Sequence, residues 1–151
     1  MEEDRNLVKR ANDFIRTRGL LSMWLPNFGS VGVLNSTEYG FDVCCVNPNY
    51  YGNTGHDYQW INHTSAFIKT FRLGIQINYG KGILFNDHHL IDYLNLGLPQ
   101  YNNYVEDCLI IYQFHNLTMK ETYENSFVDY VRLYSSIKNI YTKVSYPGIA
   151  Y

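Results

Sequence analysis

The segment Ala66-Phe67-Ile68-Lys69-Thr70-Phe71-Arg72-Leu73-Gly74-Ile75-Gln76-Ile77-Asn78-Tyr79 decides which fold the sequence predicts. Its odd positions are apolar except for one lysine, and most of its even positions are polar or glycine. This alternation with a period of two is typical of a strand that turns one face to a core and the other to water. The sequence therefore predicts one long strand over residues 66–79, bent at Gly74, in an antiparallel sheet that helices cover on one side.

Two amphipathic helices are predicted, one near each end of the chain. Residues 3–18 begin with acidic side chains, end with basic ones and are followed by Gly19, as in an α-helix. Five of its apolar residues share a face that we expect to dock on the core: Leu7, Val8, Ala11, Phe14 and Ile15. A capping box at residues 118–121 starts the second helix, which runs to Tyr141. We expect its apolar stripe to pack on the sheet: Tyr123, Phe127, Val131 and Tyr134.

The remaining segments complete the predicted architecture. Residues 29–34 and 41–46 are β-rich runs joined by a turn, which indicates a hairpin, and residues 105–114 form a further apolar strand. A short helix is predicted over residues 88–96, and Cys108 in the apolar strand is expected to be buried. The resulting order is α-β-β-β-β-α-β-α. Residues 1–151 are therefore predicted to form one α+β domain, a two-layer sandwich with a mostly antiparallel sheet.

Composition narrows the classes of function. The chain has 151 residues, a net charge of −2 and a charged share of 17%, which argues against general nucleic-acid binding. Three cysteines without paired spacing favour free thiols in a reducing compartment, and the start of the chain has no apolar signal segment. No apolar run is long enough to cross a membrane. These features predict a cytoplasmic protein, and the sequence holds no motif for a metal or another cofactor.

A loop rich in Tyr, Asn and Gly over residues 47–60 has the composition of a recognition surface, and residues 99–104 repeat it. Aromatic side chains give stiff contact area, and amides add hydrogen bonds. The predicted binding residues are Tyr50, Tyr51, Asn53, His56, Tyr58, Trp60, Tyr101 and Tyr104. The first functional hypothesis is a small protein-binding adaptor, inhibitor or viral or phage host-interaction factor. A homo-oligomer is left open beside a separate protein partner. An ordinary surface loop in an Asn- and Tyr-rich chain is the competing interpretation.

Two further functions stay open from the sequence. A small hydrolase would use Cys44 or Cys45 as nucleophile, since a thiolate needs a neighbouring base and the base needs an orienting acid. The candidates for the base are His56 and His63, and the candidate acid is Asp57. A ligand-binding module would instead stack a carbohydrate or nucleotide on the aromatic residues of the loop.

Overall fold

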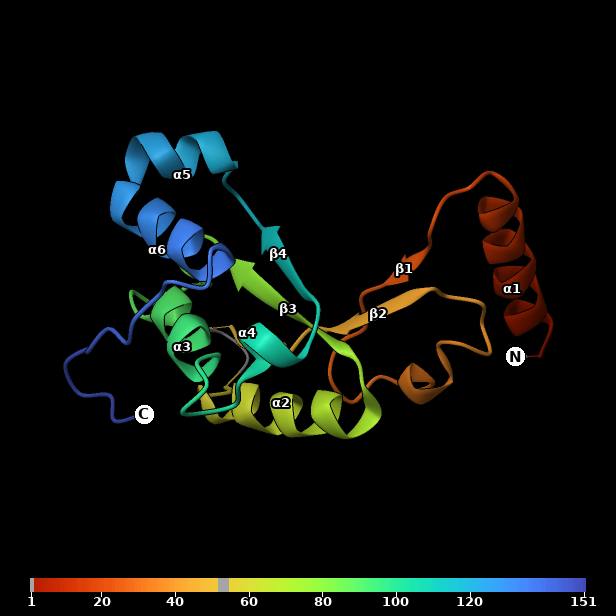
Figure 1. Cartoon of the computed structure of the whole chain (residues 1–151), viewed down its shortest axis with the longest axis horizontal. Coiled ribbons are helices and arrows are strands. Elements are labelled where there is room, and N and C mark those ends of the chain that lie inside the picture. Colours follow the sequence, from red (N-terminus) through yellow and green to blue (C-terminus); the bar gives the residue numbers. More distant parts are fainter. Residues whose placement is uncertain (1, 52–54) are drawn as a thin grey trace.

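The computed structural model describes residues 2–51 and 55–151, and Figure 1 shows how their helices and strands are arranged. The chain first forms α1 (Glu2–Thr17), β1 (Met23–Trp24), the short 3-10 helix η1 (Val33–Asn35) and β2 (Val43–Val46). It continues with α2 (Gln59–Phe71), β3 (Gly74–Tyr79), α3 (His89–Leu96), α4 (Tyr104–Asp107) and β4 (Ile110–Phe114). Helices α5 (Met119–Asn125) and α6 (Phe127–Ile137) follow the last strand.

The four strands form one curled sheet in the order β1-β2-β3-β4, and every neighbouring pair is parallel. The predicted α+β sandwich with a mostly antiparallel sheet is therefore wrong, and so is the predicted hairpin over residues 29–46. Parallel neighbours need a crossover that returns the chain to the same end of the sheet. Helix α2 supplies this crossover between β2 and β3, and α3 and α4 supply it between β3 and β4. The architecture belongs to the α/β class.

The error arises in residues 66–79, which contain the end of a helix followed by a strand. Four buried residues of α2 recur at helical spacing: Ile61, Thr64, Ser65 and Ile68. The helix ends at Arg72, which adopts the left-handed conformation with φ of 55° and donates its N–H to the Ile68 carbonyl. Gly74 then starts β3 where a side chain would collide with the Sγ atom of Cys45. The alternation of apolar residues before Arg72 therefore comes from one side of helix α2 and not from a strand.

The two faces of the sheet differ in chemistry. Since paired residues share a face and neighbours along a strand alternate, one face carries Cys44, Val46, Ile75, Ile77 and Tyr79. These side chains form the core with buried residues of three helices: Ile61, Ile68, Leu90, Leu94 and Leu133. Figure 1 shows α2, α3 and α6 gathered on this side of the sheet. The opposite side, here called the open face, carries Cys45, Asn47, Gln76 and Asn78 on its two central strands.

The predicted C-terminal helix divides into two. The capping box is confirmed, because Thr118 and Glu121 exchange hydrogen bonds at the start of α5. Ser126 leaves helical geometry and separates α5 from α6. Helix α6 buries Leu133 in the core, but the expected stripe is largely exposed, with Phe127 at 56%. That stripe therefore does not pack on the sheet.

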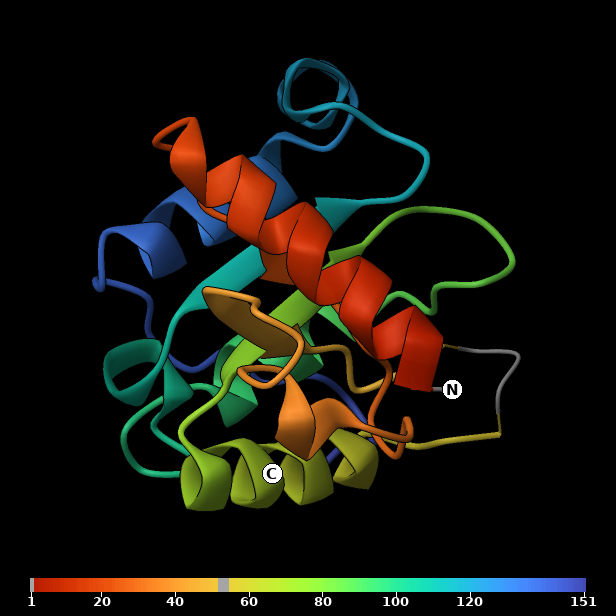
Figure 2. The same cartoon turned by 90° about the vertical axis from the view of Figure 1, so that its right-hand side faces the viewer.

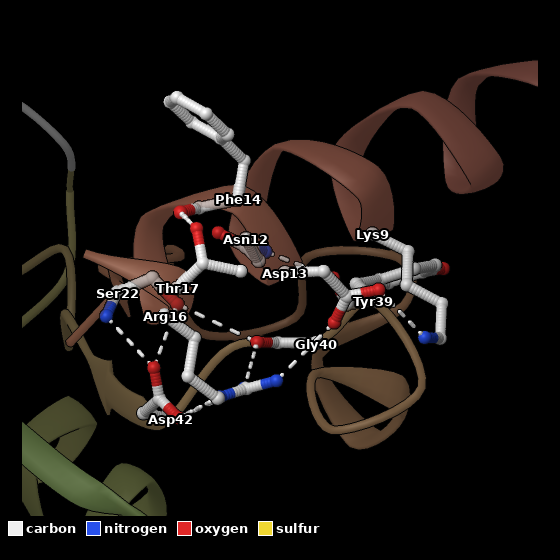
Figure 3. A network of polar contacts seen from close by, with 10 residues as sticks. All are labelled: Lys9, Asn12, Asp13, Phe14, Arg16, Thr17, Ser22, Tyr39, Gly40 and Asp42. Carbon is white, nitrogen blue, oxygen red and sulfur yellow. Dashed lines mark hydrogen bonds and ion pairs between the residues drawn. The ribbon is translucent and has the colours of Figure 1, made fainter. Parts of the chain in front are cut away.

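Polar contacts, not apolar packing, hold α1 (Figure 3). Asn12 donates to the carbonyl oxygen of Tyr39 at 2.8 Å, and Arg16 donates to the Asp42 carboxylate and the Gly40 carbonyl oxygen, each at 2.9 Å. These contacts fasten the helix to the connection between β1 and β2 (Figure 2). The predicted docking face is mostly exposed, with Phe14 at 60%. The expectation that this face joins the core is therefore wrong.

Replacing Arg16 by alanine is expected to loosen α1 without unfolding the sheet, because exposed ion pairs contribute little to global stability. Hydrogen exchange of amides in residues 2–17 should become several-fold faster, while the melting temperature moves by no more than a few degrees. Arg10→Ala on the same helix is the control, and equal exchange rates in both variants would contradict the assignment.

The burial of the helix-covered face can be tested with two isoleucines. Ile77→Ala removes a fully buried side chain of β3 and should lower the free energy of unfolding by about 2–5 kcal/mol. Ile83→Ala makes the same change where the side chain is 96% exposed, and should cost less than about 0.5 kcal/mol. Similar losses in denaturant titrations of the two variants would show that the faces of β3 are misassigned.

Candidate functional site at the carboxyl ends of the strands

Polar side chains collect where the parallel strands end. In α/β proteins, ligands bind outside the carboxyl ends of the strands, because loops and helix starts converge there. Asn27 and Asn47 follow β1 and β2 and form an isolated parallel bridge, and Asn78 lies one residue before the end of β3. A cavity of about 760 Å³ lies at the opposite, amino-terminal ends of β2, β3 and β4. We place the candidate site at the carboxyl ends, because a network of hydrogen-bonded side-chain amides lies there.

A chain of side-chain amides crosses all four strands at this end. Asn47 donates to Asn27 at 3.0 Å, and Asn78 donates to the Oδ1 atom of Asn47 at 2.7 Å. The Nε2 atom of Gln76 donates to Asn78 at 2.6 Å and also to Gln113 of β4. We call these five residues the amide chain. Each link joins the N–H donor of one amide to the oxygen of the next. Because side-chain amides do not ionise, the network holds no formal charge.

The middle of the amide chain is buried, and its two ends are open. Asn47, Gln76 and Asn78 are buried, so their polar atoms must find partners within the protein, and the amide chain supplies them. Asn27 at one end and Gln113 at the other are exposed. The buried links therefore fix the geometry, and the exposed ends can offer hydrogen bonds to a ligand.

Aromatic rings lie beside the β4 end of the amide chain. Tyr51 has its hydroxyl 3.0 Å from the Nε2 atom of His115, and this nitrogen is 3.4 Å from the Oδ1 atom of Asn78. The ring of Phe85 lies 5.8 Å from that of Tyr51 and 5.4 Å from that of His115. Burial lowers the pKa of His115, so its imidazole is neutral at pH 7. The group therefore offers apolar faces and uncharged hydrogen-bonding atoms.

A buried carboxylate positions the loop that carries Tyr51. Asp92 of α3 is fully buried and accepts hydrogen bonds from the hydroxyls of Tyr50, at 2.6 Å, and Tyr151. The Nδ1 atom of His88 lies 2.7 Å from the same carboxylate. Burial raises the pKa of Tyr50 above its usual value. Because these contacts fix Tyr50, they also fix the neighbouring Tyr51 at the edge of the site.

His89 is a second buried group behind the site. Its ring stacks on Tyr50 with centroids 4.6 Å apart and an angle of 12° between the planes. Burial, and to a smaller extent the charge of His88, lowers the pKa of His89 to about 3, although contact with the Asn78 backbone opposes the shift. The imidazole is therefore neutral at all but strongly acidic pH.

The predicted binding residues separate into three groups. Tyr50 and Tyr51 lie at the site just described. Trp60 stacks on His56 with ring centroids 4.1 Å apart, at the start of α2. Tyr58 and Tyr101 line a small cavity of about 260 Å³ next to Tyr151.

Two predicted binding residues do not join these groups. Tyr104 is buried, and its hydroxyl donates to the carbonyl oxygen of Tyr93, so it belongs to the core. Asn53 lies outside the described residues. Tyr50 is buried as well, so the predicted binding residues do not all belong to an exposed surface.

The residues predicted for a hydrolase do not form a reactive group in the described contacts. Cys44 and Cys45 are buried in β2, and burial raises the thiol pKa of Cys45 to about 11. A thiol with a raised pKa holds little thiolate at pH 7 and is a poor nucleophile. His63 lies edge-on to Trp60, and Asp57 accepts a hydrogen bond from the backbone of Gln59 at the start of α2. Cys108 is a half-buried free thiol, and burial raises its pKa to about 11.

Most of the amide chain was not predicted from the sequence. Its signal is an amide that follows or interrupts an apolar run, as Asn47 does after β2 and Gln76 and Asn78 do within β3. That signal has meaning only when the strands are known to be parallel, because only then do their carboxyl ends meet. The Asp92 cluster joins residues 42 and 59 positions apart, and no local pattern marks it.

A parallel sheet with a polar site at its carboxyl ends defines this molecule as an α/β protein. Residues 1–138 match the family DUF4855, a domain of unknown function, and the chain belongs to this family. Searches of the curated proteins and of the solved structures each found no match. Among residues 2–51 and 55–151, no three His, Cys, Asp or Glu side chains are grouped so that they could hold a metal ion. No helix in that part of the chain is long and apolar enough to cross a membrane.

The depressed pKa of His89 predicts a loss of stability in mild acid. The unfolded chain binds a proton on this histidine below about pH 6.5, while the folded protein resists doing so until about pH 3. Stability should therefore fall as pH decreases through this window. Melting temperatures between pH 7.5 and 4 should decline less steeply for His89→Phe than for the native protein. Equal slopes for the native protein and His89→Phe would contradict the prediction.

Proposed function

We propose that this protein binds a neutral, hydroxyl-rich ligand of the carbohydrate class at the carboxyl ends of its strands. The observation that carries this proposal is the amide chain, which is uncharged, internally fixed and open at both ends. An amide both donates and accepts hydrogen bonds, and so does a sugar hydroxyl, so the two groups are complementary. Fixing the amides before the ligand arrives lowers the entropic cost of binding.

The aromatic rings beside the amide chain support the same class of ligand. The faces of Tyr51 and Phe85 are suited to the apolar C–H surface of a sugar ring, while neutral His115 reaches hydroxyls. The charged phosphate of a nucleotide is bound most strongly by a cationic side chain. Lys81 follows β3, but its ammonium group is already 2.6 Å from the Asp129 carboxylate. The site therefore favours a neutral ligand over an anionic one.

The adaptor or inhibitor function remains a second proposal with support of its own. Large apolar side chains are exposed on both helical ends of the described chain, among them Leu7 and Phe14 on α1 and Phe127 on α6. Exposed apolar surface of this kind marks interaction sites on folded proteins. The cytoplasmic location also remains a proposal, supported by three free cysteines.

Calorimetric titration with neutral oligosaccharides tests the carbohydrate proposal. The panel would contain short oligomers of glucose, xylose, galactose and N-acetylglucosamine, with adenosine monophosphate as the anionic comparison. Gln113→Ala removes one exposed end of the amide chain and should weaken binding about tenfold, as expected for one good hydrogen bond. Gln100→Ala removes an exposed amide outside the amide chain and should leave affinity unchanged.

Three results would count against the proposal. One is the absence of measurable heat with every oligosaccharide at millimolar concentration. Another is tighter binding of the nucleotide than of any sugar. The third is an equal loss of affinity in the Gln113 and Gln100 variants, which would place the ligand elsewhere.

A further inference from the structure

The order of the strands gives the sheet two open ends. Each strand adds to the same side of the one before it, so the sheet continues in one direction. Within residues 2–51 and 55–151, the first and last strands, β1 and β4, pair on one side only. A parallel sheet that curls while repeating this step closes into a barrel when it reaches eight strands. The described chain supplies four strands, half of that number.

Neither edge strand carries the charges that normally keep an open edge from pairing. Residues 19–37, which include β1, and residues 108–119, which include β4, contain no Asp, Glu, Lys or Arg. Exposed edges in natural proteins usually carry lysine, inward charges or proline on the open side. Pro26 does not protect its edge, because its carbonyl oxygen accepts from Asn47 and therefore faces β2. Both edges are chemically suited to accept another strand.

The open face is apolar and exposed at these same two edges. Asn27 pairs with Asn47, which belongs to the open face, so alternate residues of the preceding segment point the same way: Leu21, Met23 and Leu25. Leu109 takes the corresponding position beside β4. Leu21 is 76% exposed, Leu109 52% and Met23 46%. In a closed barrel these side chains would point into the interior, where layers of apolar residues pack.

The total surface also exceeds that of a typical monomer. A folded monomeric protein of 17.7 kDa is expected to expose about 7,900 Å². This chain exposes 8984 Å², about 1,000 Å² more than the scaling predicts. A standard protein–protein interface buries about 800 Å² on each partner, so the excess matches one such interface.

We propose that two copies of this chain close into one eight-stranded parallel barrel, with β4 of each copy pairing with β1 of the other. A two-fold axis along the barrel makes the two seams identical, keeps all eight strands parallel and leaves no open edge. The open faces of both copies become the barrel interior. The second copy then supplies the opposite wall of the mouth that the amide chain lines. This assembly rests on the sheet and its edges, and it does not require the carbohydrate function.

Light scattering coupled to size-exclusion chromatography tests the assembly with purified protein and no added ligand. One copy of the chain has a mass of 17.7 kDa, and at micromolar concentration the native protein should show twice this mass. Leu25→Glu and Leu109→Glu each place a charge inside the closed barrel, at opposite edges of one copy, and each should weaken dimerisation at least 100-fold. Ile83→Glu adds the same charge at a 96% exposed position outside both edges and should leave the dimer intact.

Hydrogen exchange of the native protein provides a measurement that needs no substitution. Amides of residues 23–27 and 110–114 should exchange more slowly at high protein concentration than at low concentration, because both seams form together. A monomer at every concentration would overturn the proposal, and so would an open-ended polymer. A dimer that persists in the Leu25→Glu or the Leu109→Glu variant would also overturn the proposal. So would hydrogen exchange that slows in only one of the two segments. A dimer without sugar affinity would overturn only the proposed function, and a sugar-binding monomer only the barrel.

Discussion

Strand β3 is buried over its whole length, and this burial constrains the rest of the sheet. Its backbone groups need partners on both sides, because an unpaired buried amide or carbonyl costs as much as a lost hydrogen bond. Strands β2 and β4 supply these partners, and because both pair in parallel, helical crossovers must return the chain to the same end. The apolar side chains of β3 then meet these helices, and its amides face the other way.

The amide chain follows from the same constraint. Gln76 and Asn78 are buried on the open face, where an unsatisfied side-chain amide would be costly. Neighbouring strands place Asn47 and Gln113 within hydrogen-bonding distance, so each buried amide finds a partner of its own kind. Since no member carries a charge, the network avoids the larger cost of burying an ion. A requirement of stability thus produces an ordered network of amides at the carboxyl end of the sheet, buried in its middle and exposed at Asn27 and Gln113.

Local signals in the sequence predicted several elements well. The capping box at Thr118, the helix over residues 88–96 and the helix near the start of the chain agree with α5, α3 and α1. The runs containing β2 and β4 were also recognised as strands, although residues 105–107 of the strand predicted over 105–114 belong to helix α4. Strand direction was not predictable in this way, because a parallel and an antiparallel neighbour require the same apolar residues. Residues 66–71 show a second difficulty, since a short apolar run on one side of a helix also fits a period of two.

The candidate site was predictable only in part, for a related reason. Tyr50 and Tyr51 stood out by composition, yet their roles depend on Asp92 and His115, which follow 42 and 64 residues later. Composition marked the aromatic residues but did not separate those that line a surface from Tyr104, which fills the core.

Polarity along the open face changes from one end of the strands to the other. One layer across the strands carries Leu25, Cys45 and Leu109 on this face, and the next residues toward the carboxyl ends carry the amide chain and His115. Burying apolar side chains lowers the free energy whichever chain covers them. The amides at the exposed ends are stabilised only by a partner with matching hydrogen-bond donors and acceptors. The apolar layer is therefore suited to association, and the amide chain to selective recognition. The apolar residues and the amide chain lie at different positions along the same strands. A substitution among the apolar residues can therefore be made without altering the hydrogen bonds of the amide chain.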